Sequence, residues 1–347
     1  MGTDRAARAF IGSFTTAGGR GVTVAAVDQE TGALSPLGST AAVANPSFLV
    51  SSPDGSVLYA VGETSDGRAA AFDITGPEPR LLGEPVPVDG AGPTHLALAA
   101  GHLLTANYES GSVTALPLRP DGGPGPAASV LAHHGCGPDP DRQREPHAHQ
   151  VLADPSGRWV VSVDLGTDSV RVCELDRQTG ALRLHAEAAL RPGSGPRHLA
   201  FHPDGRHAYV VNELAPTLTV CRWDAGSGVL EPLGETAVVA HGVRGEIYPS
   251  EAVVGHDGRF LWVACRGHDS IAVLALDETG EEARLVTGVA CGGHWPRDLT
   301  LDPSGRRLYA SNERSGDVTW FAIDAATGIP ALAGSIEAPA ASCVVFC

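Results

Sequence analysis

The sequence predicts an all-β fold, a seven-bladed β-propeller with four antiparallel strands in each blade. Three observations predict it. A hairpin phrase recurs along the chain at intervals of about 50 residues, a period typical of propellers. Apolar and polar residues alternate within each copy, as strands require. No amphipathic stretch of about 12 residues or more has helical periodicity.

Each copy of the phrase contains a strand, a tight turn and a second, apolar strand. The copy GPRHLAFHPDGRHAYVVNEL runs from Gly195 to Leu214 and turns at Gly205. Glycine supplies the positive φ that a tight hairpin turn requires. Six copies are present, and their turn glycines are Gly55, Gly101, Gly157, Gly205, Gly258 and Gly305.

A third apolar strand often follows the hairpin, and a weaker fourth strand comes after it. Third strands are expected at 169–176, 270–277 and 317–324, and turns containing Thr-Gly lead on to the fourth strands. Four short antiparallel strands in each unit make a propeller blade.

The two ends of the chain predict the seventh blade. Segments 8–15, 21–28 and 34–43 resemble a second, third and fourth strand, and segment 338–347 resembles a first strand. Their union closes the ring and removes two free sheet edges. We therefore expect one propeller domain over residues 1–347.

Composition and charge limit the kinds of binding partner and the cellular compartment that we expect for this protein. The net charge of −16 argues against nucleic acid or an anionic membrane, and no apolar run reaches the roughly 18 residues of a membrane span. The N-terminus lacks the features of a secretory signal, so we expect a cytoplasmic protein, as a monomer or weak homo-oligomer. All 24 basic residues are arginine, which excludes lysine-based covalent catalysis.

The variable ends of the copies are expected to meet at one mouth of the central channel. Arg197 lies eight residues before Gly205 and Glu213 eight residues after it, so the two should face each other at the open end of the hairpin. The same count in the other copies adds polar residues at this mouth. They are Glu63, Tyr108, His149, Arg266, Arg297 and Glu313.

Two interpretations of these residues compete. Arg197 with Glu213, like Arg297 with Glu313, fits a cross-strand ion pair worth about 0.2–1 kcal/mol. The residues Arg266 and His149, however, face no carboxylate within their own hairpins. Unlike polar groups that converge on a channel mouth favour a small-molecule site.

A long insertion before the third copy supports a site at this face. It contains four histidines and two arginines, and functional loops commonly lie on one face of a rigid scaffold. These residues are His133, His134, Arg142, Arg144, His147 and His149. A zinc site is an alternative, but no carboxylate or cysteine has a convincing ligand spacing, so we predict no metal and no cofactor.

Several segments resemble the seven-bladed propeller lactonase family, which includes propeller-type 6-phosphogluconolactonases and carboxymuconate lactonising enzymes. The resemblance rests on PHAHQVLADPSGRWVV, GPRHLAFHPDGRHAYVVNEL, YPSEAVV with DGRFLWVACRGHDSIAV, and WPRDLTLDPSGRRLYASNE. It covers nearly the whole chain, in order. It implies lactone chemistry, and it implies that four residues act on the substrate. These are His149, Arg197, Glu213 and Arg266.

The favoured hypothesis is a metal-independent lactonase acting on an anionic sugar lactone such as 6-phosphogluconolactone. Arg197 and Arg266 would hold the anion and stabilise the oxyanion, while His149 and Glu213 would serve as acid and base in either order. Further substrate contacts are expected from Arg297, His147, Glu313, Tyr108 and Glu63.

Two other hypotheses remain open. A carboxymuconate-type lactonising lyase or isomerase would use the same residues on an unsaturated polycarboxylate. A non-enzymatic propeller would instead present a surface to a protein partner, and it would require an exposed apolar patch.

Overall fold

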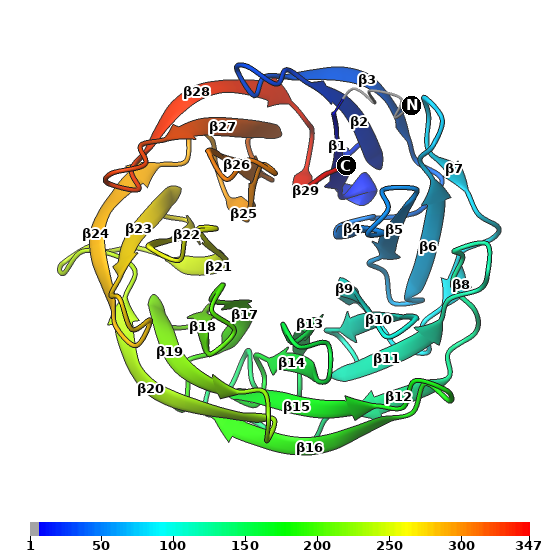
Figure 1. The fold of residues 1–347 in the computed structure, drawn as a ribbon, viewed down its shortest axis with the longest axis horizontal. Helices are drawn as coiled ribbons and strands as arrows, with labels where there is room; N and C mark the ends of the chain where they lie inside the picture. The colour runs from blue at the N-terminus through cyan, green and yellow to red at the C-terminus, as the bar shows by residue number, and fades with distance from the viewer. Residues whose placement is uncertain (1–6) are drawn as a thin grey trace.

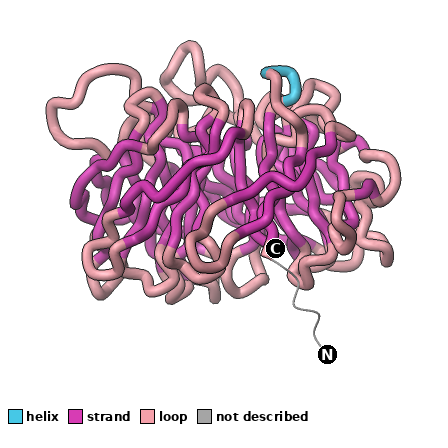
Figure 2. The backbone as a smooth tube through the Cα atoms, turned by 90° about the horizontal axis from the view of Figure 1, so that it is seen from above, coloured by secondary structure: helices cyan, strands magenta, loops and turns pink. Residues whose placement is uncertain are grey.

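A computed structural model describes residues 7–347 of the chain. Seven sheets surround a central channel (Figure 1), and the strands run between two faces formed by loops (Figure 2). The predicted seven-bladed all-β propeller is confirmed, and the first six residues of the predicted domain lie outside the described part. The one helical element among the described residues is a short 3₁₀ turn, η1 (Thr15–Ala17). Within residues 7–347, no helix is long and apolar enough to cross a membrane.

The blades are numbered here in chain order, and each begins with its innermost strand. Blade 1 consists of β29 (Ala341–Phe346), β1 (Arg8–Ser13), β2 (Val22–Val27) and β3 (Leu34–Thr40). Blade 2 consists of β4 (Leu49–Ser51), β5 (Val57–Gly62), β6 (Arg68–Asp73), β7 (Arg80–Leu81) and β8 (Val86–Pro87). Blade 3 consists of β9 (Pro93–Ala99), β10 (His102–Asn107), β11 (Ser112–Pro117) and β12 (Ser129–Ala132).

The remaining blades repeat this arrangement. Blade 4 consists of β13 (Ala148–Ala153), β14 (Val160–Asp164), β15 (Ser169–Leu175) and β16 (Leu182–Ala189). Blade 5 consists of β17 (Pro196–Phe201), β18 (His207–Asn212), β19 (Thr217–Asp224) and β20 (Val229–Ala237). Blade 6 consists of β21 (Tyr248–Val254), β22 (Phe260–Arg266), β23 (Ser270–Leu276) and β24 (Ala283–Ala290). Blade 7 consists of β25 (Pro296–Leu301), β26 (Arg307–Asn312), β27 (Asp317–Ile323) and β28 (Pro330–Glu337).

The hydrophobic core is divided among the interfaces between blades. Between blades 4 and 5, for example, Trp159 and Val161 pack with Leu199 and Trp223. Comparable clusters fill the other interfaces around the ring. Because side chains alternate across each strand, both faces of a blade are apolar and each neighbour covers one of them.

Blade 1 closes the ring as the sequence predicts. Its inner strand β29 comes from the C-terminal end of the chain and pairs antiparallel with β1, with Phe10 opposite Val345. Figure 1 shows the red β29 beside the blue β1. This pairing protects the inner edge of β1, which would otherwise present unpaired N–H and C=O groups.

The inner strands carry an irregularity that the equal count of residues did not foresee. In blade 5, Pro196 pairs with Asn212 and His198 with Val211, so Arg197 is the extra residue of a β-bulge. Equivalent register shifts lie at Thr94, His149, Arg297 and Ser342, and a shift in β21 spans Ser250 and Glu251.

The bulges correct the predicted register by one residue. Arg197 does not lie directly across from Glu213; the Glu213 N–H instead donates to the carbonyl of Gly195 at 2.7 Å. The turn itself is as predicted, and Gly205 has a φ of 68°. A bulge redirects the side chain of its extra residue, so the bulges determine which side chains face the channel.

Candidate active site

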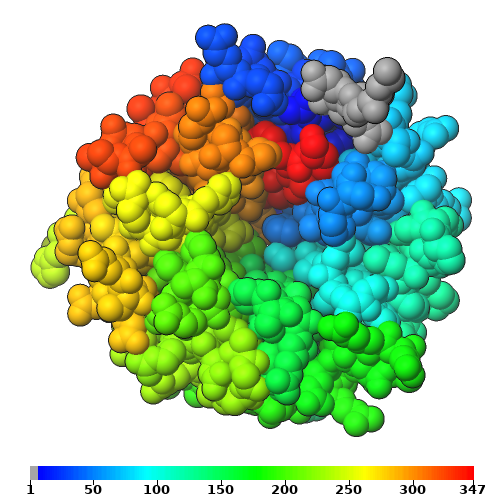
Figure 3. Space-filling view, in the orientation of Figure 1, coloured from blue at the N-terminus to red at the C-terminus, as the bar shows by residue number. Residues whose placement is uncertain are grey.

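A cavity lies at the mouth of the channel, on the face that carries η1. It has an empty volume of about 280 Å³, including its opening to solvent. Figure 3 shows the opposite face of the ring, where the channel also opens as a central hollow. On two inner strands, two consecutive residues both line the cavity on the η1 face: Arg197 with His198, and Arg297 with Asp298. In a regular strand, consecutive side chains would point to opposite faces. The lining residues are Ser47, Phe48, Glu63, Thr94, His149, Arg197, His198, Arg297, Asp298 and Ser342.

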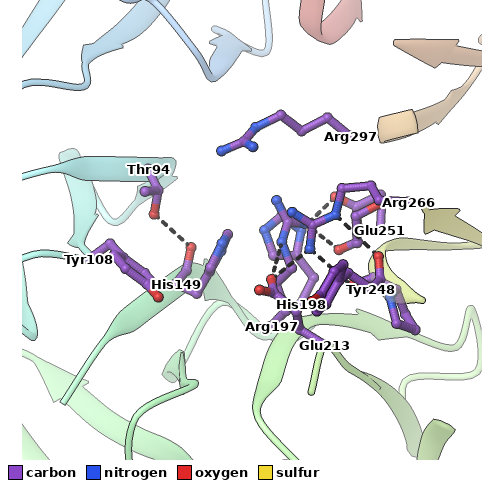
Figure 4. Close-up of polar contacts among 12 residues, drawn as sticks. Thr94, Tyr108, His149, Arg197, His198, Glu213, Tyr248, Glu251, Arg266 and Arg297 are labelled. Carbon is purple, nitrogen blue, oxygen red and sulfur yellow. Dashed lines mark hydrogen bonds and ion pairs between the residues drawn. The ribbon is translucent and has the colours of Figure 1, made fainter. Parts of the chain in front are cut away.

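Glu213 is the centre of an arginine cluster beside this cavity (Figure 4). Its Oε2 lies 2.7 Å from a terminal nitrogen of Arg266 and 3.3 Å from Nε of Arg197. Its Oε1 accepts a hydrogen bond from Arg142 at 2.6 Å. The predicted proximity of Arg197 and Glu213 is therefore present, and side chains from two blades and a loop meet at one carboxylate.

The cluster fixes the charge state of its members. Burial alone would raise the pKa of Glu213, but Arg266, Arg197 and Arg142 together lower it to about 2. Burial, followed by the charge of Arg266, lowers the pKa of Arg197 to about 9, which leaves that guanidinium protonated at neutral pH. Glu213 is thus a permanent anion, and an anion with so low a pKa is a weak base.

Arg297 reaches into the cavity from blade 7, separately from the Glu213 cluster (Figure 4). It donates to Glu313 at 3.1 Å and lies over the ring of Phe14, 4.7 Å from its centroid. Across the cavity, Ser47 donates to the carboxylate of Glu63, and burial raises the pKa of Glu63. Arg297 therefore adds a cationic group to the cavity wall that does not contact Glu213.

His149 stands on the opposite side of the cavity from the arginine cluster (Figure 4). Burial, followed by the charge of Arg197, lowers its pKa well below 6.5, so the ring is neutral. Its Nδ1 is buried and has no hydrogen-bond partner among the described residues. A neutral imidazole with a bare ring nitrogen can accept a proton.

Tyr108 and His147 form the rim beside His149. The ring of His147 stacks on Tyr108 with centroids 4.4 Å apart, and His149 meets Tyr108 edge-on at 5.5 Å. The hydroxyl of Tyr108 accepts a hydrogen bond from Arg142 at 3.3 Å. Neither Tyr108 nor His147 lines the cavity wall itself, so both shape its entrance.

The inserted loop does not gather its histidines around one point. His133 is paired with Asp164 at 2.6 Å, away from the stacked His147. Among residues 7–347, the only histidine, cysteine and carboxylate group with metal-ligand spacing is His202, Asp204 and His207, in the hairpin turn of blade 5. The loop supplies Arg142 to the mouth instead.

Three buried residues next to the predicted ones lie outside the predicted site. The sequence favours a packed or hydrogen-bonded histidine at His198, and it singles out neither Glu251 nor Asp298. His198 and Asp298 directly follow Arg197 and Arg297, and Glu251 follows Ser250, the residue eight positions before Gly258 that the hairpin count places across from Arg266. Strict alternation assigns these positions to the blade interfaces. A signal was nevertheless present, since adjacent polar residues in RHLAF, SEAVV and RDLTL break the expected alternation at the same place in three copies.

Comparison with known proteins places this architecture in a family. The profile described as "Lactonase, 7-bladed beta-propeller" matches residues 8–346. A 6-phosphogluconolactonase from Bacillus subtilis is 34% identical over 97% of each chain. The structure of a periplasmic gluconolactonase from Pseudomonas aeruginosa superposes with a TM-score of 0.92 at 29% identity, covering 98% of both chains. A Lactobacillus plantarum protein gives the same TM-score at 28% identity, covering 98% of this chain and 99% of its own.

The chain belongs to the seven-bladed β-propeller lactonase family. These relatives support an enzyme with lactonase activity and a small lactone as its substrate.

Proposed function

We propose that this enzyme hydrolyses an anionic sugar lactone of the 6-phosphogluconolactone type at the mouth of the channel, without a metal ion. The observation that carries the proposal is the convergence of four guanidinium groups around one cavity that also holds a neutral histidine. Arg142, Arg197 and Arg266 contact a single carboxylate, and Arg297 stands apart with Glu313. The relatives named as 6-phosphogluconolactonase and gluconolactonase support the substrate class.

The arginines have two roles in this proposal. Arg297 has the fewest bonds to protein and suits the phosphate, to which a guanidinium can donate two parallel hydrogen bonds. Arg197 and Arg266 are held rigidly by Glu213 and suit the oxyanion that forms when water attacks the lactone carbonyl. Glu213 then acts as the anchor of these arginines, because its low pKa makes it a poor proton acceptor.

His149 delivers the proton to the leaving oxygen. Hydrolysis adds water to the carbonyl carbon, breaks the ring C–O bond and leaves an alkoxide that needs a proton. That proton originates from the attacking water, and a neutral imidazole can carry it as an imidazolium. Between the two orders of acid and base that the sequence leaves open, the geometry favours His149 as the proton carrier.

The test is a hydrolysis assay with freshly generated 6-phosphogluconolactone, from which the spontaneous rate is subtracted. The wild-type enzyme should hydrolyse it with EDTA present, and Arg197→Ala should lower kcat/KM at least 100-fold, about 2.7 kcal/mol. Arg158→Ala is the matched control, since Arg158 lies over Trp159 away from the channel mouth. Activity of Arg197→Ala within threefold of wild type, or none in the wild type, would contradict the proposal.

A further inference from the structure

A second histidine lines the same cavity and is held by a carboxylate. Nδ1 of His198 lies 2.5 Å from Oε2 of Glu251, and both side chains are buried. Burial, followed by the charge of Arg197, keeps the pKa of His198 well below 6.5, so its ring is neutral. A neutral ring that donates its Nδ1–H to a carboxylate has a bare Nε2, and Nε2 of His198 has no partner among the described residues.

A second carboxyl group fixes the first. Asp298 is hydrogen-bonded to Glu251, and the backbone N–H of Val344 donates to Asp298 at 3.2 Å. Burial raises the pKa of Glu251 to about 7, and burial followed by the charge of Glu251 raises the pKa of Asp298 well above 3.8. Two adjacent buried carboxyl groups favour one shared proton, which leaves one negative charge beside His198. Glu251 also accepts the N–H of Ala252 at 3.0 Å, which leaves it little freedom to turn.

The two imidazoles are neighbours. The ring centroids of His149 and His198 lie 5.1 Å apart at an angle of 66°. Each ring has a buried nitrogen without a partner, and both residues line the cavity. Buried polar atoms are nearly always satisfied, so two unpartnered ring nitrogens on neighbouring residues that line one polar cavity indicate a function that uses them.

We propose that His198, oriented by Glu251 and Asp298, is the base that takes the proton from the attacking water. This rests on the proposed function and completes it, because arginines engage both carboxylate oxygens of Glu213, whereas Nε2 of His198 has no partner among the described residues. As the water oxygen bonds to the lactone carbonyl carbon, its proton passes to Nε2 of His198, and the carboxylate of Glu251 stabilises the imidazolium. When the ring C–O bond breaks, the electron pair stays on the alkoxide, and the proton reaches that oxygen through His149.

Kinetics test the role of His198. His198→Gln should lower kcat for 6-phosphogluconolactone at least 100-fold and change KM less than threefold, because His198 handles the proton and the arginines bind the substrate. His95→Gln is the matched control, since His95 is equally buried and its ring lies 5.3 Å from that of His198, but no carboxylate holds it. It should keep kcat within threefold. Equal losses in both variants would overturn the proposal.

A spectroscopic measurement tests the orientation independently of substrate. In the wild-type enzyme, the His198 Nδ1–H should give a strongly downfield proton resonance coupled to a ¹⁵N-labelled imidazole. Glu251→Gln should shift it upfield and lower kcat at least tenfold. A protonated Nε2 in the wild type would overturn the inference even if His198→Gln failed to fold.

The two proposals can fail separately. If the wild type hydrolyses the lactone while His198→Gln remains within threefold of it, the proposed function stands and the base is not His198. If no lactone is hydrolysed but the Nδ1–H resonance is present, the orientation by Glu251 stands and the proposed function fails.

Discussion

Three buried histidines show how burial, together with nearby positive charge, sets the protonation of single residues. His95, His149 and His198 form a series of ring contacts, with centroids 5.3 and 5.1 Å apart. All three are buried, and burial is the largest cause that lowers the pKa of each. Desolvation disfavours an imidazolium, so these rings stay neutral at a pH at which an exposed histidine would begin to titrate.

This neutrality should make stability depend on pH. For His95 the unfolded chain gains a proton below pH 6.5 while the folded protein does not, so falling pH favours unfolding. Between pH 7 and 5, the free energy of unfolding of the wild type should fall by about 2 kcal/mol more than that of His95→Gln. Urea denaturation at both pH values measures this difference. Parallel changes in the two proteins would show that His95 titrates alike in both states.

At the scale of elements, the inserted loop and the bulged strands build the mouth together. The loop brings Arg142 to Glu213 and Tyr108, although Arg142 belongs to no strand. Its side chain is 37% exposed, whereas that of Glu213 is 5% exposed, so Arg142 covers the cluster from outside. An element of this kind can alter ligand binding with little effect on the core.

Replacing Arg142 should therefore affect the substrate more than the fold. Arg142→Ala should raise KM for a phosphorylated lactone about tenfold, because a cationic group is lost, and should change the free energy of unfolding by less than about 1 kcal/mol. Arg144→Ala is a close control, since that side chain is 76% exposed and pairs with Asp141. Steady-state kinetics and urea denaturation of both variants measure the two effects. If Arg142 were only a surface charge, Arg142→Ala and Arg144→Ala would change KM equally.

The sequence predicted the elements better than the details of the site. Turn glycines and apolar alternation defined the blades, because the same buried hairpin is needed in each copy. The bulges were missed because counting from Gly205 assumes a regular ladder, and one extra residue at Arg197 shifts everything beyond it. Arg142 could not be placed, since loop paths follow from packing and not from periodicity. Glu251 and Asp298 were not predicted for the same reason as the bulges, because a regular ladder assigns their side chains to the interfaces between blades.

At the scale of the whole molecule, the ring depends on one strand. The C-terminal strand β29 follows blade 7 in the chain and pairs with β1, so it carries the chain from blade 7 into blade 1. Other contacts across this seam include the hydroxyl of Tyr309, which donates to the carbonyl of Gly32 at 2.7 Å. Residues of β29 also enter the interface core, where Ala341 and Val344 pack with Tyr309 of β26. Without β29, both the inner edge of β1 and this core would be open to water.

Removal of residues 340–347 should therefore abolish the cooperative unfolding of the ring. The truncated chain is expected to lose its sharp thermal transition, because the β1 edge and the core between blades 7 and 1 become exposed. A synthetic peptide of residues 338–347, added in excess, should restore part of the transition by mass action. A scrambled peptide should not. A truncated chain that melts like the intact one would show that the ring is stable while open.

The bulges also bear on how such an enzyme can acquire new substrates. Five blades present the extra residue of a bulge to the same small space, while their apolar side chains are committed to the neighbouring blades. Substitutions at these positions change the chemistry of the cavity while the apolar contacts between blades stay in place. A library that randomises them would sample many chemistries on one unaltered scaffold. The positions are Thr94, His149, Arg197, Arg297 and Ser342.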